Sequence, residues 1–151
     1  AKRQPTASDL RLILMISKAV TDLERMGDVA DKLARMVINN TSRSHPPLVS
    51  LESMGRQAIK MLHDALDAFA RMDVEAAIQL YHDDDKIDRQ YESIIRELMT
   101  YMMEDPRTIP QVLEVLWAAR SLERIGDIAK TIAATVVFLK EATDIRHGRE
   151  R

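Results

Sequence analysis

The chain has no cysteine, only four glycines and five prolines among 151 residues, and aromatic side chains make up just 4%. Without cysteine there are no disulfides, no thiolate metal ligands and no cysteine nucleophile. The longest apolar run, residues 132–139, is far too short to cross a bilayer. Lys and Arg are dispersed along a chain of net charge −2. With few aromatic rings to stack on bases, this composition argues against nucleic-acid binding.

Helical periodicity dominates the rest of the sequence. Hydrophobic residues make up 46% and charged residues 30%, as in globular proteins. Apolar residues recur at i, i+3, i+4 and i+7, and no segment shows sustained strand alternation. The sequence therefore predicts an all-α protein with helices at about 8–40, 48–72, 74–104 and 108–143. Asp73 and Thr108 are the expected N-caps of the last two helices. Long helices joined by short turns form antiparallel bundles.

One motif occurs twice: L-E-R-φ-G-D, where φ is apolar, at residues 23–28 and again at 122–127. The two copies are 122 − 23 = 99 residues apart. A period near 100 residues that contains three helices predicts a duplicated three-helix unit. We therefore divide the chain into 1–43, the third helix of a first unit, and 44–151, a complete second unit. The two earlier helices of the first unit would precede this chain, which we expect to be incomplete at its N-terminus.

Two further expectations concern the motif glycines and the helix at 8–40. Each motif copy places a glycine in mid-helix, Gly27 or Gly126, at a cost of about 1 kcal/mol relative to Ala. The repetition predicts close helix–helix approach at both glycines. Without its two partner helices, the first helix would also expose a large apolar surface. This apolar stripe includes Leu14, Leu23, Leu33 and Val37.

Acidic pairs with i, i+4 spacing lie on one face of three helices. They are Glu24 and Asp28, Asp84 and Asp88, and Glu123 and Asp127. In an antiparallel arrangement the second and third pairs meet at the same level, because they lie 18–22 residues before and 17–21 residues after the turn near residue 106. Like charges at this spacing repel each other, so each pair is electrostatically unfavourable. A bound cation would make the same two charges favourable. Carboxylate ligands suit hard ions such as Mg²⁺, Mn²⁺ or iron. The six acids are therefore candidate metal ligands.

The same acids have a plainer interpretation. Most i, i+4 acids lie on solvated faces, and Arg25 and Arg124 could neutralise Glu24 and Glu123 by reaching neighbouring helices. The sequence contains neither a Gly-rich phosphate loop nor a G-x-S-x-G motif. It also lacks the E-x-x-H motif of di-iron oxidases. We therefore expect no enzymatic activity, and a metal-dependent hydrolase is the most remote interpretation.

The doubled L-E-R-φ-G-D-φ-A motif, together with the segment LMTYMMEDPRTIP at 98–110, resembles the PhoU family over essentially the whole chain. The resemblance implies an antiparallel three-helix bundle preceded by the last helix of an incomplete first repeat. It also implies an acidic metal-binding motif, with iron, zinc, Mg²⁺ or Mn²⁺ as the ion. Carried over by position, the second repeat's site comprises Asp84, Asp88, Glu123 and Asp127, and the first repeat supplies only Glu24 and Asp28.

The resemblance further implies a function. Family members are cytoplasmic negative regulators of phosphate uptake and of phosphate-responsive two-component signalling. They act as adaptors between the phosphate ABC transporter, through its ATPase, and a sensor histidine kinase. The expected chain is thus a homodimeric, non-enzymatic adaptor that associates only peripherally with membrane complexes. The alternative is a purely structural helical scaffold or dimerisation module without a metal site.

Overall fold

The computed structural model describes residues 7–40 and 49–147, and within these ranges the side chains of 9–38, 50–81 and 85–140. It contains α1 (Ala7–Asn40), α2 (Val49–Arg71), α3 (Val74–Glu104), the short 3₁₀ helix η1 (Pro106–Thr108) and α4 (Ile109–His147). The described ranges contain no strand, so the all-α prediction is confirmed. The predicted bounds agree to within one residue, except that α4 continues to His147 rather than ending at 143. The loop predicted at 41–47 lies outside the described residues.

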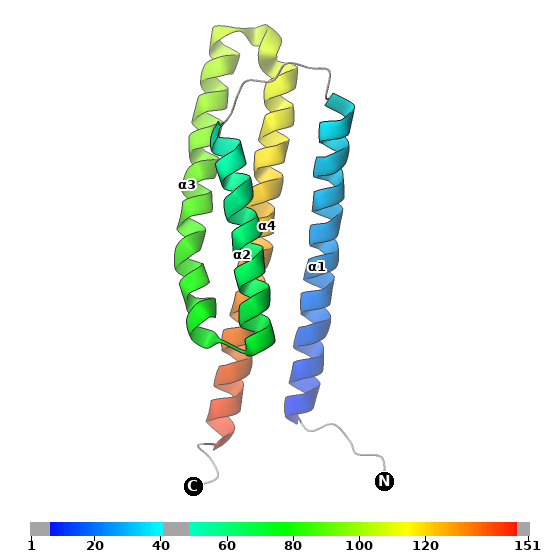
Figure 1. The fold of residues 1–151 in the computed structure, drawn as a ribbon, viewed down its shortest axis with the longest axis vertical. Helices are drawn as coiled ribbons and strands as arrows, with labels where there is room; N and C mark the ends of the chain where they lie inside the picture. The colour runs from blue at the N-terminus through cyan, green and yellow to red at the C-terminus, as the bar shows by residue number, and fades with distance from the viewer. Residues whose placement is uncertain (1–6, 41–48, 148–151) are drawn as a thin grey trace.

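Helices α2, α3 and α4 form an antiparallel bundle, and α1 lies alongside it against α4 (Figure 1). Alanines at buried positions on all three bundle helices leave room for close packing, and larger side chains fill the space between them. The largest fully buried side chains are Met54, Met61, Ile87, Ile94, Leu98, Val112, Ile132 and Val136. None of the described helices has the length and hydropathy needed to span a membrane.

The two turns of the bundle are fixed by local hydrogen bonds. Asp73 caps α3 as predicted, because its carboxylate accepts a hydrogen bond from the Ala76 amide at 3.0 Å. Before it, Met72 takes the left-handed conformation (φ 53°) that ends α2. The prediction of Thr108 as an N-cap is wrong. Its hydroxyl instead donates back to the Asp105 carbonyl at 2.7 Å, and the Asp105 side chain caps η1 by accepting from the Arg107 amide.

Helix α1 is attached by one narrow seam. Ala19, Asp22 and Met26 are buried, and α1 packs on α4 alone among the described elements. The predicted apolar exposure is confirmed at Leu14 and Val37, which are 57% and 65% exposed. Leu23 and Leu33, the other members of the predicted stripe, are half-buried.

The expectation of close approach at the two motif glycines has different outcomes. Gly126 on α4 is buried in the bundle. A Cβ added at Gly27 would meet no described atom within 4 Å, so the prediction of close approach is wrong there. The glycine faces a side of α1 that no described element covers.

Candidate functional site

The acidic residues of α3 and α4 meet where the antiparallel geometry predicts. Glu123 on α4 is half-buried. It experiences electrostatic repulsion from Asp127, one turn along α4, and from Asp88 on α3. Burial raises the pKa of Glu123 above its ordinary value, and Asp127 and Asp88 raise the pKa further. Arg120 and Arg124 lower the pKa in part. This electrostatic coupling supports the predicted common level of the two acidic pairs.

The fourth predicted acid of this site is Asp84. Its backbone belongs to α3, but its side chain lies outside the described part of the structure. Among the side chains that are described, no three His, Cys, Asp or Glu groups converge tightly enough to enclose a metal ion. The donors at the α3–α4 face are nonetheless all carboxylates, and this chemistry suits a hard divalent cation or iron. The pattern accordingly fits a cation by charge and donor type.

The acids of α1 lie elsewhere. At about 100° of helix rotation per residue, Glu24 is about 200° and Asp28 about 240° around α1 from Asp22. Asp22 lies in the buried seam against α4, whereas Glu24 and Asp28 are exposed. The structure therefore does not bring this pair to the α3–α4 acids. It leaves the pair on a side of α1 that no described element covers.

The arginines of the two motif copies behave differently. Arg124 lowers the pKa of Glu123, which precedes it on α4, by its positive charge. Among the described residues, Arg25 pairs within its own helix: its guanidinium lies 3.9 Å from the carboxylate of Asp22, three residues earlier on α1. Other surface acids have i, i+4 partners, such as Asp31 with Arg35 at 2.8 Å. Exposed pairs of this kind contribute at most about 1 kcal/mol each.

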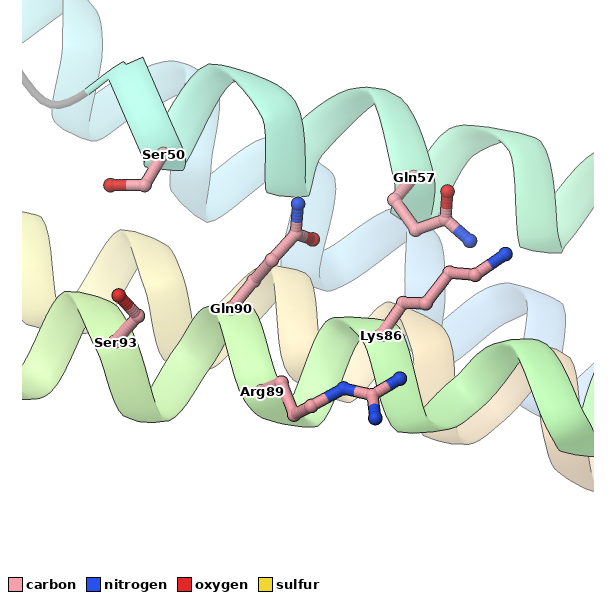
Figure 2. A pocket seen from close by; sticks show the side chains of 6 residues that line it. All are labelled: Ser50, Gln57, Lys86, Arg89, Gln90 and Ser93. Carbon is pink, nitrogen blue, oxygen red and sulfur yellow. The ribbon is translucent and has the colours of Figure 1, made fainter.

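A second polar feature was missed by the sequence reasoning. A groove between α2 and α3 is lined by six polar side chains, which Figure 2 shows from close by. They are Ser50, Gln57, Lys86, Arg89, Gln90 and Ser93. The signal was available on α3, because positions 86, 89, 90 and 93 follow i, i+3, i+4, i+7 spacing and so share one face. The acidic residues interspersed among these positions make the shared polar face hard to recognise in the sequence.

The fold and the acidic face together define a class of protein. It is all-α, with a three-helix bundle formed by α2, α3 and α4, and with α1 related to α4 by the sequence repeat. Carboxylates of α3 and α4 lie at one level of the bundle. The comparisons with known proteins narrow this class. A family model described as "PhoU domain" matches residues 1–37 and 51–136. The chain belongs to the PhoU family.

Relatives of known name cover almost all of this chain. The phosphate-specific transport system accessory protein PhoU of Escherichia coli (strain K12) is 57% identical over 148 residues, which is 97% of this chain and 61% of the relative. The PhoU homolog of Pseudomonas aeruginosa is 52% identical over 149 residues, or 97% of this chain and 62% of the relative. The chain thus spans about three fifths of the length of the curated relatives it matches.

Solved structures agree with this assignment. The crystal structure of PhoU from Pseudomonas aeruginosa superposes with a TM-score of 0.88 at 51% identity, covering 93% of this chain and 68% of the other. The structure of the phosphate transport system regulatory protein PhoU from Streptococcus pneumoniae gives a TM-score of 0.82 at 32% identity, covering 90% and 65%. The helical-bundle fold predicted from sequence is therefore confirmed by homologous structures as well as by the chain's own.

Proposed function

We propose that this chain belongs to a non-catalytic accessory protein of phosphate-specific transport that represses phosphate uptake and phosphate-responsive two-component signalling. Its relatives bear the name of accessory protein of that transport system. The observation that supports the proposal best is the acidic face, where Glu123 is coupled to Asp127 and to Asp88 on the neighbouring helix. A half-buried carboxylate among like charges costs stability, so its presence is better explained by a ligand than by folding.

The ligand proposed for this face is a hard cation. Asp84, Asp88, Glu123 and Asp127 would hold it, and Glu24 and Asp28 would contribute to a corresponding site in a complete first repeat. Iron, zinc, Mg²⁺ and Mn²⁺ are the candidate ions. A bound ion would neutralise the repulsion at Glu123 and tie α3 to α4. It would thereby give the outer face of the bundle a charge that depends on metal supply.

The proposed partners are proteins of the phosphate uptake system. In this proposal the chain is a cytoplasmic adaptor that contacts the ATPase of the phosphate ABC transporter and a sensor histidine kinase. It associates with the membrane only through these complexes. The acidic α3–α4 face, with or without its ion, is the contact surface.

Two measurements test the proposal. Metal content is determined in the purified chain and in a variant with Asp84→Asn, Asp88→Asn, Glu123→Gln and Asp127→Asn. We expect the variant to lose most of the bound metal, since neutral amides replace anionic ligands. A matched control removes four acids that lie elsewhere: Asp31→Asn, Glu52→Gln, Asp64→Asn and Glu92→Gln. Equal metal uptake by all three proteins would contradict the site.

The regulatory role is tested separately in cells whose own copy of the protein has the same four α3–α4 substitutions. We expect expression of phosphate-uptake genes to remain high in phosphate-rich medium. Normal repression in these cells would show that the acidic face is dispensable for regulation, even where it binds metal. A pull-down of the kinase and of the transporter ATPase by wild type and variant then identifies which contact has been lost.

The alternative is a structural scaffold or dimerisation module. Exposed apolar residues along α1, including Ile13, Leu14, Val20 and Val37, favour this candidate. In that case α1 pairs with a second copy and the acids are solvated side chains. A homodimer whose partner binding and phosphate repression survive loss of the four acids would support the scaffold function over the metal-dependent adaptor.

A further inference from the structure

An apolar groove lies between α1, α3 and α4, toward the end of the molecule where α1 and α3 begin and α4 ends (Figure 1). It consists of two adjoining hollows of about 340 Å³ and 450 Å³, which share Tyr81, Ala134 and Phe138. The other apolar side chains that line it are Met15 on α1, Ile78 on α3 and Val137 on α4. Tyr81, Phe138 and Ile78 are all exposed, so two aromatic rings face solvent here. We call this feature the aromatic groove.

The polar side chains of the aromatic groove leave it suited to apolar groups. The Thr131 hydroxyl donates to the Asp127 carbonyl, and the Thr135 hydroxyl donates to the Thr131 carbonyl, each at 3.0 Å. Both hydroxyl protons are therefore used within α4. Lys18 and Lys130 also line the groove, and lysine stems cover apolar surface while their ammonium groups reach solvent. An apolar side chain fits this lining better than a small polar molecule does.

The aromatic groove continues into the acidic face along both helices. On α3 one stripe has i, i+3, i+7, i+10 spacing and consists of Ile78, Tyr81, Asp85 and Asp88. On α4 one stripe has i, i+4, i+7, i+11 spacing and consists of Asp127, Thr131, Ala134 and Phe138. Because the two helices are antiparallel, both stripes change from apolar to acidic in the same direction. Asp127 lies seven residues before Ala134, so the acids begin about 10 Å from the groove.

The acidic end of the two stripes is negative in spite of the arginines beside it. Asp127 and Asp88 each raise the pKa of Glu123. Arg120 and Arg124 each lower it, but by less than either acid raises it. The surface between α3 and α4 therefore has an apolar end and, next to it, an end of negative potential.

We propose that the aromatic groove binds an amphipathic helix of a partner protein, with apolar side chains between Tyr81 and Phe138 and with Lys or Arg residues over the acids. Recognition of this kind places the apolar face of a helix in a groove, and aromatic anchors supply most of the affinity. The opposite charges fix the direction of the helix along the groove. Two turns of a helix span about 11 Å, which matches the separation of groove and acids. The inference rests on the proposed function in one respect, namely that the occupant is a protein that contacts the α3–α4 face.

The test uses the full 151-residue chain and synthetic helical peptides of about five turns, in a chelator so that no metal ion neutralises the acids. Each peptide has leucines on one face and, two turns away on the same face, lysines. The lysines lie at the N-terminal end in one peptide and at the C-terminal end in the other, since either direction fits two antiparallel stripes. We expect one peptide to bind saturably and to shift the ¹⁵N NMR signals of Ile78, Ala134 and Phe138. Absence of saturable binding by both peptides would overturn the proposal.

Peptide controls test the pattern and the charge. A scrambled peptide of the same composition should bind at least about tenfold more weakly, because it has no continuous apolar face to bury. A peptide with glutamates in place of the lysines should also bind more weakly, since like charges then meet. Equal binding of either control would overturn the proposal. Shifts of the same groove residues that grow with protein concentration, without peptide, would assign the groove to a second copy of this chain and would also overturn it.

Two double variants test the position of the site. Tyr81→Ala/Phe138→Ala should weaken peptide binding by at least about tenfold, because two aromatic rings no longer contribute buried area. The matched control is Met103→Ala/Trp117→Ala, which removes exposed apolar side chains from the same two helices outside the groove. We expect less than about a twofold change in this control, as at other distant surface sites. Equal loss in the two variants, with unchanged far-ultraviolet circular dichroism, would overturn the proposal.

A charge reversal outside the proposed metal ligands separates this inference from the proposed function. Asp85→Lys should weaken binding of the lysine peptide and reduce its salt dependence, whereas Glu52→Lys, at an exposed position on α2, should do neither. Equal effects of the two reversals would overturn the proposal. Normal metal content without peptide binding would refute the docking site alone. Peptide binding together with normal phosphate repression in the four-acid variant would refute the regulatory proposal alone.

Discussion

Helices α1 and α4 have matching residues at matching positions, yet their surroundings differ. Val136 on α4 is fully buried, while its counterpart 99 residues earlier, Val37, is 65% exposed. Ala133 on α4 is also fully buried, while Ala34 is exposed. The apolar side chains that α4 buries in the core of the bundle therefore have counterparts on α1 that no described element covers.

The difference shows what the repeated pattern encodes. The repeated pattern specifies a helix that packs against two other helices. For α4 these two helices are α2 and α3. Among the described elements, helix α1 contacts only α4, through a seam on its other side. Periodicity thus predicts which face of a helix is to be covered, but the covering elements must be identified independently.

The largest expected effect comes from placing the same charge at the two matched valines. Val136→Asp should lower the free energy of unfolding by about 3–5 kcal/mol, because it leaves an uncompensated charge in the core. Val37→Asp should change it by less than about 0.5 kcal/mol in the monomer, as at other solvated surface positions. Urea denaturation followed by circular dichroism measures both. Similar losses at the two positions would mean that Val37 is covered in solution.

The second prediction concerns what covers α1. If α1 pairs with a second copy, the double substitution Leu14→Lys/Val37→Lys should weaken self-association by at least about tenfold, since burying each side chain contributes about 1.5–3 kcal/mol. Sedimentation equilibrium measures the dissociation constant. The control is Leu113→Lys, at the repeat counterpart of Leu14, which is 45% exposed on α4. A compact monomer at all concentrations of wild type would contradict pairing between copies.

The comparison also separates what the sequence can predict from what it cannot. Helix positions, the Asp73 cap and the common level of Asp88 and Glu123 follow from local pattern and from counting residues around one turn. The error at Gly27 has another cause, because the sequence motif does not show which face of α1 the described helices cover. Thr108 was misassigned because Asp105 competed for the capping role. Such a choice depends on backbone geometry rather than on residue type.

A smaller effect is expected from the pH dependence of Glu123. Its folded pKa lies above the ordinary value of 4.5, so the folded chain binds this proton more tightly than the unfolded chain. The stability that the proton supplies is full below pH 4.5 and is lost as pH rises through the folded pKa. Glu123→Gln should therefore raise the free energy of unfolding at neutral pH by a few tenths of a kcal/mol. This gain should disappear below about pH 4.5.

The control for this titration is Glu92→Gln, an exposed acid of α3 whose carboxylate lies 3.9 Å from the guanidinium of Arg96. It should not gain stability at neutral pH, since it removes an attraction rather than a repulsion. The readout is the urea midpoint of each variant relative to wild type between pH 4 and pH 8. A stability gain from Glu123→Gln that persists unchanged at pH 4 would contradict the electrostatic cause.

The central claim is that the acids of α3 and α4 form a cation site. The most direct measurement is the thermal midpoint of wild type and of the variant Asp84→Asn/Asp88→Asn/Glu123→Gln/Asp127→Asn, each in a chelator and then in excess Mn²⁺. In the chelator the variant should melt at or slightly above the temperature of wild type, because like-charge repulsion is relieved. In Mn²⁺ only wild type should gain, by an amount that grows with ion concentration as binding linkage requires. Equal shifts in the two proteins, or no shift in wild type, would contradict the claim.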